Sequence, residues 1–265
     1  HNTSVAVGDL HACAVTGSNL SCWGKETKGA LGDGSPHTSN SATPVTVTSP
    51  TVWTPIDVSA NHDSTCTLYR NATDVKRIYC WGSVWLRADG GVLSGDLSEP
   101  TNPVLVYDSS AAELELSFTS SELTVAPYDV EEITLGHNFA CARSFEGMVK
   151  CWGNNSAGQL GIGNSEDMGD EDDEMGTDLP YMNLGTNLVA EKAALGEGHT
   201  CILFTNDSVK CFGSIGAIGL GYSDSTGGGD GYLETGDYMP FWPAPSGRSV
   251  EDIEAGSHHT CAVFD

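Results

Sequence analysis

The sequence predicts an all-β fold, a β-propeller of four-stranded blades. Three observations lead to this prediction: one unit recurs along the chain, each full unit carries two cysteines in a hairpin-like pattern, and turn signals separate short alternating stretches. Four-stranded sheets that repeat radially form a propeller. The 265 residues suffice for one large all-β domain, so we expect a single propeller, or part of one, over 1–265.

The repeat is clearest where a Gly, or once an Asn, stands five residues before a cysteine. These first cysteines are 53, 75, 60 and 60 residues apart. Gly and Asn tolerate a positive φ best, so the recurrence predicts one left-handed backbone shape at this position. The segments are GDLHAC (8–13), NHDSTC (61–66), GHNFAC (136–141), GEGHTC (196–201) and GSHHTC (256–261).

Each of the first four units continues with a second cysteine, a glycine-rich turn, a Pro-containing extended stretch and an alternating run. These signals predict about four short strands per unit. Residues 111–123 could be helix or strand. The predicted repeats are 5–52, 53–130 with an insertion over 83–130, 131–190, 191–249 and a partial fifth over 250–265.

An aromatic residue follows the second cysteine of each full unit, and a glycine follows the aromatic. Large rings fill the space between blades, while glycines let the chain turn tightly beside them. We therefore expect inter-blade packing for Trp23, Trp81, Trp152 and Phe212.

The combined pattern, clearest in GHNFACARSFEGMVKCWGNNSAGQLGIG (136–163), resembles the repeat of the regulator of chromosome condensation family. The resemblance covers nearly the whole chain. It implies a propeller of the seven-bladed type, of which this chain holds four full repeats and the start of a fifth. The family's founding activity, nucleotide exchange on a small nuclear GTPase with chromatin binding, fits badly with the charge and cysteines found here, so we carry over the fold alone.

The cysteines form four local pairs, each bracketing one hairpin, and one is left over. Opposite residues of antiparallel strands lie close enough to bridge, which predicts disulfides. Zinc is the rival interpretation, because a His often precedes the first cysteine by two residues, and free core thiols are another. The predicted bridges are Cys13–Cys22, Cys66–Cys80, Cys141–Cys151 and Cys201–Cys211, with Cys261 unpaired or bonded to another chain.

Disulfides predict an extracellular or cell-surface location. The first residue, His1, suggests a mature or trimmed product whose leader has been removed. The missing blades suggest that the polypeptide continues beyond Cys261, although a bond to another chain is the alternative. Glycosylation sequons, three of them inside the cysteine-bracketed hairpins, fit a secreted glycoprotein; they are Asn2, Asn19, Asn71, Asn154 and Asn206.

No cofactor is expected, although one acidic loop is a weak calcium candidate. Clustered carboxylates suit calcium, but the order in 164–178 departs from EF-hand spacing, and acidic runs are more often solvated loops. The candidate ligands are Asp167, Asp170, Asp172 and Asp173. The glycine-rich stretch 225–232 lacks the Lys of a phosphate-binding loop.

The charge limits the range of partners. Eleven basic against 36 acidic residues give a net charge of −25, which disfavours nucleic acids and anionic membranes. No apolar run spans a bilayer, and no catalytic motif stands out, so we expect no enzyme. The insertion is expected to bind a partner.

The favoured function is therefore a non-enzymatic, structural or adhesive extracellular glycoprotein. It would contact other proteins or copies of itself, as a subunit of a cell-surface or filamentous assembly. The alternative is a ligand-recognition module for carbohydrate or calcium-dependent binding.

Overall fold

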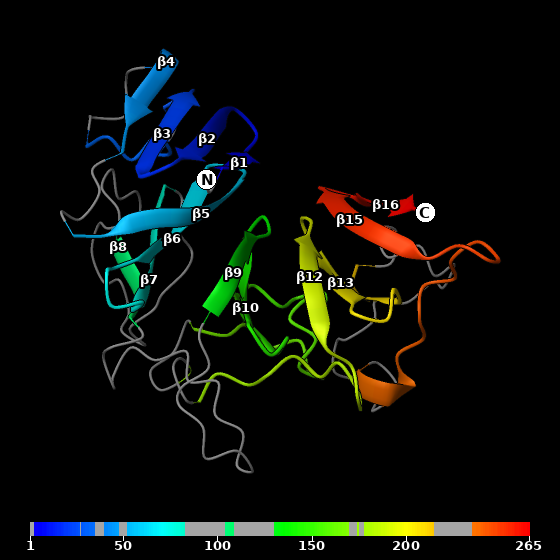
Figure 1. Ribbon diagram of the computed structural model, residues 1–265. Helices are drawn as coiled ribbons and strands as arrows, with labels where there is room; N and C mark the ends of the chain where they lie inside the picture. The colour runs from blue at the N-terminus through cyan, green and yellow to red at the C-terminus, as the bar shows by residue number, and fades with distance from the viewer. Residues whose placement is uncertain are drawn as a thin grey trace. The chain divides into compact units, whose positions relative to one another are not determined.

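The computed structural model describes residues 3–26, 28–34, 40–47, 52–82, 104–108, 130–169, 174, 178–214 and 235–265. The described part is built from strands, with one 3-10 helix over Gly236–Tyr238 (Figure 1). The predicted all-β class is confirmed. The chain divides into two compact units: residues 1–135 with 169–177, and residues 136–168 with 178–265.

The first unit contains two antiparallel four-stranded sheets, with strand orders β1-β2-β3-β4 and β5-β6-β7-β8. A further strand, β9 (Val130–Leu135), contacts β5 and β6. The strands are β1 (Thr3–Val7), β2 (His11–Thr16), β3 (Asn19–Gly24), β4 (Ser41–Thr46), β5 (Thr54–Asn61), β6 (Ser64–Arg70), β7 (Lys76–Gly82) and β8 (Val104–Asp108).

The second unit contains a hairpin, a three-stranded sheet of order β12-β13-β14 and a two-stranded sheet, all antiparallel. Its strands are β10 (Phe139–Ser144), β11 (Val149–Gly153), β12 (Ala190–Leu195), β13 (His199–Phe204), β14 (Val209–Gly213), β15 (Val250–Gly256) and β16 (His259–Phe264).

Alternating apolar residues bring the sheets of each unit together. In the first unit, Trp81 of the second repeat shares a buried cluster with Leu31 of the first repeat. In the second unit, Phe212 of the fourth repeat shares a buried cluster with Leu160 of the third. Residues from successive repeats thus form common cores, as expected when each blade buries one face against its neighbour.

The fourth strand of the repeat is complete only in the first two repeats among the described residues. In the third repeat, the corresponding stretch makes a single bridge between Lys150 and Tyr181, next to Pro180. In the fourth, Trp242 donates its backbone N–H to the Val209 carbonyl, in a segment flanked by prolines. Proline has no N–H to donate, so it limits these outer stretches to isolated contacts.

The prediction of a left-handed backbone five residues before the first cysteine was wrong. Gly8, Gly136, Gly196 and Gly256 all lack a positive φ. Each glycine instead lies directly against the ring three residues later, so that a Cβ atom there would overlap His11, Phe139, His199 or His259. The recurring feature is contact with a ring, which leaves no room for a side chain.

The glycine after each aromatic is the position that requires a positive φ. The values are 117° at Gly24, 93° at Gly82, 104° at Gly153 and 102° at Gly213. A Cβ at any of them would also meet the backbone carbonyl of the residue just before the neighbouring strand. Only glycine satisfies both conditions, which explains the recurring Cys-aromatic-Gly triplet.

Candidate functional site

The four predicted disulfides are all present. In every case the two cysteines lie directly opposite each other in an antiparallel pair, with Cα atoms 4.0–4.1 Å apart. Their sulfurs are bonded to each other, so these eight cysteines offer no thiolate to zinc. The bridges are Cys13–Cys22, Cys66–Cys80, Cys141–Cys151 and Cys201–Cys211.

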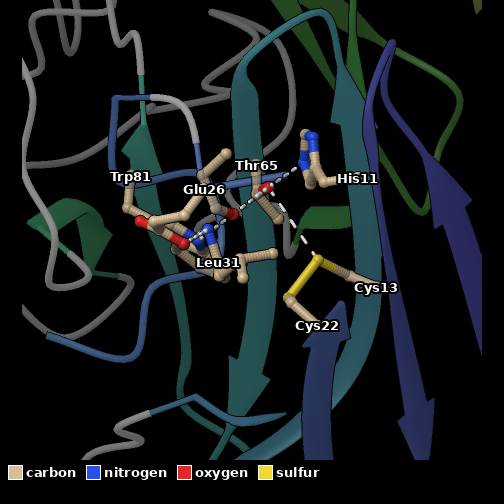
Figure 2. Close-up of a disulfide and its surroundings, with 8 residues drawn as sticks. His11, Cys13, Cys22, Glu26, Leu31, Thr65 and Trp81 are labelled. Atoms are coloured by element: carbon tan, nitrogen blue, oxygen red, sulfur yellow. Dashed lines mark hydrogen bonds between the residues drawn. A yellow bond between two sulfur atoms is a disulfide. The ribbon is translucent and has the colours of Figure 1, made fainter. Parts of the chain in front are cut away.

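A buried polar network links the first two repeats beside the first disulfide (Figure 2). His11 Nε2 lies 2.8 Å from Thr65 Oγ1, and that hydroxyl donates to the Ala30 carbonyl at 3.2 Å. The Trp81 indole N–H donates to the same carbonyl at 2.9 Å. Burial lowers the pKa of His11, partly offset by Asp63 and Asp9, so a neutral imidazole suits this site.

The same contact recurs between the fourth and fifth repeats in the second unit. His199 Nε2 lies 2.9 Å from Thr260 Oγ1, and Cys201 Sγ lies 3.4 Å from the same hydroxyl. Burial, with help from His258 and His259, lowers the pKa of His199 to about 4. The repeating pair is thus a His two residues before one first cysteine and a Thr one residue before the next.

The contact between the third and fourth repeats lacks the His. Phe139 holds the equivalent position in the third repeat, and the hydroxyl of Thr200 in the fourth has no hydrogen-bond partner in the described part of the chain. The His–Thr bond therefore joins the first repeat to the second and the fourth to the fifth, but it is absent between the third and the fourth.

Another recurring contact closes the glycine-rich turn. Asn155 Oδ1 accepts the Leu160 N–H at 2.9 Å in the third repeat, and Glu26 Oε2 accepts the Leu31 N–H at 3.2 Å in the first. The Asn amide also donates to the Asn164 carbonyl, whereas Glu26 Oε1 has no partner among the described residues. Burial and the nearby Asp33 raise the pKa of Glu26 to about 7, with the Leu31 N–H opposing them.

Two buried lysines stand beside the second cysteines of the third and fourth repeats. The Lys150 ammonium lies 4.8 Å from the Tyr181 ring centroid, and that of Lys210 lies 4.8 Å from the Phe241 ring centroid. Lys210 also donates to the carbonyls of Leu184 and Gly236. Burial lowers the pKa of Lys150 to about 8, opposed by Asp178. These contacts tie the outer stretch of each repeat to its sheet.

The calcium candidates are only partly within the described structure. Asp170, Asp172 and Asp173 lie outside it. Asp167 accepts the Asn155 N–H at 2.6 Å and two bonds from the Asn154 amide nitrogen. Its carboxylate thus holds the turn that follows β11. Over the described ranges, no cluster of three or more His, Cys, Asp or Glu residues has metal-binding geometry.

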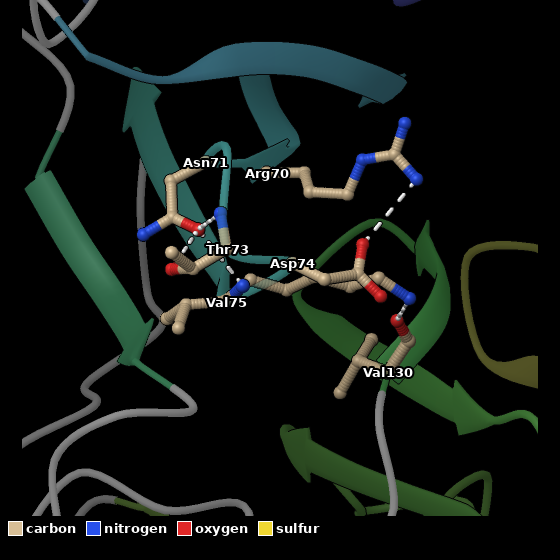
Figure 3. A network of polar contacts seen from close by, with 7 residues as sticks. Arg70, Asn71, Thr73, Asp74, Val75 and Val130 are labelled. Atoms are coloured by element: carbon tan, nitrogen blue, oxygen red, sulfur yellow. Dashed lines mark hydrogen bonds and ion pairs between the residues drawn. The ribbon is translucent and has the colours of Figure 1, made fainter.

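The sequons differ in what their side chains do. Figure 3 shows Asn71, whose Oδ1 accepts the N–H groups of Thr73 and Val75 and the Thr73 hydroxyl. Asn206 Oδ1 accepts equivalent bonds from Ser208. In both, the amide nitrogen that a glycan would join makes no hydrogen bond within the described part.

The other sequons have different surroundings. Asn19 is exposed at the start of β3. Asn154 uses its amide nitrogen on Asp167 and its oxygen on Ser156 and Gln159. Asn2 lies outside the described residues. Glycosylation at all five stays a prediction.

The remaining predictions concern the ninth cysteine, the insertion and the glycine-rich stretch. Cys261 is a free thiol, exposed on β16. The insertion over 83–130, which was predicted to bind a partner, and the stretch 225–232 lie outside the described residues, apart from the backbone of β8 and Val130. Among the described residues, no helix has the length and apolar character needed to cross a bilayer.

The inter-blade aromatic prediction is confirmed for two residues. Trp81 packs against Gly32, and Phe212 against Gly161, each in the preceding repeat. Trp152 is fully buried, whereas Trp23 in the first repeat is only partly buried.

Sequence reasoning missed the roles of Thr65, Thr260, Glu26 and the two lysines. The recurring Thr-Cys and Val-Lys-Cys segments were the available signals, because buried polar residues that recur at one repeat position have a recurring partner.

Comparison with known proteins agrees with this architecture. Residues 130–159 match the family described as "Regulator of chromosome condensation (RCC1) repeat". No curated protein sequence matches the chain significantly. Among solved structures, human WBSCR16 is similar at 17% identity and a TM-score of 0.67, over 98% of this chain and 57% of that one.

Two structures of the yeast RCC1 protein Prp20 are also similar. The Kap60-bound form matches at 22% identity and a TM-score of 0.52, and Prp20p from Saccharomyces cerevisiae at 20% and 0.54. This chain, covered to 98% in both, spans 67% and 68% of theirs, and little more than half of WBSCR16. Residues 130–159 thus match a regulator of chromosome condensation repeat, and the chain has the β-propeller fold of proteins built from such repeats.

Proposed function

We propose that this protein is a non-enzymatic extracellular glycoprotein whose propeller mediates protein–protein contacts at a cell surface. The single observation that carries the proposal is the set of four disulfides, one at the same place in each full repeat. Structural disulfides persist in oxidising compartments and are rare in the cytosol. Because the bridge recurs in every full repeat, it belongs to the scaffold itself. This recurrence supports the proposal that the chain folds in a compartment where disulfides form.

The sequons support the same location. Asn71 and Asn206 lie in turns of disulfide-bridged hairpins, and their amide nitrogens make no hydrogen bond within the described part. A glycan attached there would extend from the turn without disturbing the sheet. Repeats that share a bridge and an accessible acceptor at one end of the hairpin fit a chain that matures in a secretory pathway.

Protein contact is the function that the similar structures suggest for this fold. Yeast RCC1 was solved bound to Kap60, and Prp20p was studied for binding to Gsp1p and histones. For the present chain, a net charge of −25 favours partner surfaces that are basic or neutral. The described polar groups hold strands and turns together, which supports a scaffold role over catalysis.

The proposal is tested by expressing the chain with a secretion signal in eukaryotic cells and measuring its intact mass. We expect eight cysteines to resist alkylation until a reductant is added, and the mass to fall on treatment with an N-glycosidase. The variants Asn71→Gln and Asn206→Gln should each remove one glycan, whereas the control Asn187→Gln, which lies outside any sequon, should remove none. Reactive thiols at most of these eight positions in secreted material would refute the proposal.

A second measurement addresses partner contact. Cross-linking of the protein on living cells, followed by mass spectrometry, should recover links from its surface lysines to other surface proteins. Material that stays monomeric and uncross-linked on the cells that express it would contradict an adhesive or structural role.

A further inference from the structure

The glycine-rich turn of the first repeat covers a side chain of the second repeat. Trp81 is fully buried, and its indole lies directly against Gly32, where a Cβ atom would overlap the ring. The indole N–H donates to the Ala30 carbonyl of the same turn at 2.9 Å. We call residues 28–34 the lid, because the turn lies over the indole N–H and has to move before water can reach it.

One buried carboxyl holds the lid in place, as Figure 2 shows beside Leu31 and Trp81. Oε2 of Glu26 accepts the Leu31 N–H at 3.2 Å, directly after the Ala30 carbonyl that binds the indole. The other oxygen, Oε1, is buried and has no hydrogen-bond partner among the described residues. An ionised carboxylate is an acceptor at both oxygens, so burying Oε1 without a donor disfavours the charged form.

The third repeat closes the same turn with a group that does not titrate. Asn155 Oδ1 accepts the Leu160 N–H, and its amide nitrogen donates to the Asn164 carbonyl. Both polar atoms of this amide are therefore satisfied at every pH. Glu26 can resemble the amide only when its carboxyl is neutral, which makes closure of the first turn depend on a proton.

We propose that Glu26 is a pH-sensitive latch: its neutral carboxyl keeps the lid closed over Trp81, and loss of the proton releases the lid and loosens the contact between the first two repeats. Burial and the nearby Asp33 raise the pKa of Glu26 to about 7, with the Leu31 N–H opposing them. The closed lid therefore binds the proton more tightly than the open one. Opening becomes more favourable as pH rises from about 4.5 to 7. This device does not depend on where the protein is located.

A second titratable group reaches the lid through Thr65. The Thr65 hydroxyl donates to the Ala30 carbonyl and lies 2.8 Å from His11 Nε2. Protonation of His11 would strain this buried network at low pH, which is opposite in direction to the effect of Glu26. A comparison with a variant at Glu26 cancels this effect, because all the other charges stay the same. Those charges are Lys25, Lys28 and Asp33 on the turn, and Asp9, His62 and Asp63 around His11.

The test measures how strongly the Trp81 indole N–H is protected from hydrogen exchange in the full chain. NMR of protein with isotope-labelled tryptophan resolves the indole signals, and Trp81→Phe identifies the one that belongs to Trp81. The matched variant Glu26→Gln keeps an acceptor for the Leu31 N–H but does not titrate. From pH 5 to pH 7.5, the protection factor of Trp81 in the wild type should fall roughly tenfold to 50-fold relative to that in the variant, because closure raises the pKa from 4.5 to about 7.

Trp152 is the internal reference, since it is fully buried in the repeat whose turn Asn155 closes. Its protection should be the same in the wild type and in Glu26→Gln at each pH. A Trp81 ratio that does not change with pH would overturn the proposal. An equal fall at Trp81 and Trp152 would also overturn it, because Glu26 would then act on the stability of the whole fold.

A second comparison applies if Glu26→Gln does not fold. Glu26→Asn, which copies Asn155, then takes its place. The wild type also gives the answer by itself through the ratio of Trp81 to Trp152 protection. A fall of this ratio between pH 5 and pH 7.5 would support the latch, and a constant ratio would contradict it.

Discussion

Protonation of His199 should lower the stability of the fold more than that of any other described His. The imidazole is fully buried and bonds through Nε2 to Thr260 at 2.9 Å, while Nδ1 has no partner among the described residues. A proton on Nδ1 would therefore place a positive charge in a buried site that offers this nitrogen no acceptor among the described residues. Burial, assisted by His258 and His259, accordingly lowers the pKa of His199 from 6.5 to about 4.

The sign and size of the effect come from the linkage between proton binding and folding. The unfolded chain binds a proton below about pH 6.5, but the folded chain does so only near pH 4, so stability falls as pH decreases across that window. A tenfold difference in proton affinity corresponds to about 1.4 kcal/mol. The folded state should therefore lose about 3 kcal/mol between pH 7.5 and 4 through this one group.

The test replaces the ring by one that does not titrate. His199→Phe copies Phe139, which holds the equivalent position in the third repeat beside Gly136. Urea unfolding followed by tryptophan fluorescence at several pH values gives the free energy of unfolding of both proteins. On going from pH 7.5 to 4, the free energy of unfolding of the wild type should fall by about 3 kcal/mol relative to that of the variant.

A matched control uses Phe139→Leu at the equivalent position of the third repeat, since neither of these residues carries a titratable group. Its curve should stay parallel to that of the wild type within about 0.5 kcal/mol. Parallel curves for His199→Phe as well would refute the reasoning, because they would show that the buried imidazole accepts a proton in the folded state without cost.

Three further outcomes are expected from the same unfolding assay. Glu26→Gln should have the same free energy of unfolding as the wild type near pH 4.5 and be the more stable protein at pH 8. The reason is that the pKa of Glu26 in the folded state is about 7, so its contribution to stability is lost as pH rises through that value. The opposite trend would contradict a buried neutral carboxyl. Replacing Cys201 and Cys211 together by Ala should cost about 2.7 kcal/mol, the chain-entropy value for a sequence separation of 10, and a loss below about 0.5 kcal/mol would show that the hairpin is fixed without the bridge. Trp81→Phe keeps an aromatic ring but removes the indole N–H that donates to the Ala30 carbonyl, so the free energy of unfolding should fall by about 1 kcal/mol. No change would mean that this hydrogen bond does not contribute to stability.

The sequence alone determined the features that depend on short separations along the chain. Cysteines 9–14 residues apart that bracket a turn can meet only across a hairpin, and the structure pairs all four sets as expected. The aromatic-Gly pair after the second cysteine was also interpreted correctly for Trp81 and Phe212. Local hairpin geometry fixes which residues face each other, so spacing and residue type were sufficient there.

Only the tertiary structure determined which residues of successive repeats contact each other. The His–Thr bonds join residues 54 and 61 positions apart. The glycine five residues before four of the five first cysteines is required by contact with a ring and not by its φ. The tertiary structure also shows that Asp167 accepts hydrogen bonds from Asn154 and Asn155 and so stabilises a turn. These contacts arise where the face of one sheet meets the next, and the distance between faces depends on side-chain packing across the whole unit, which no local pattern specifies.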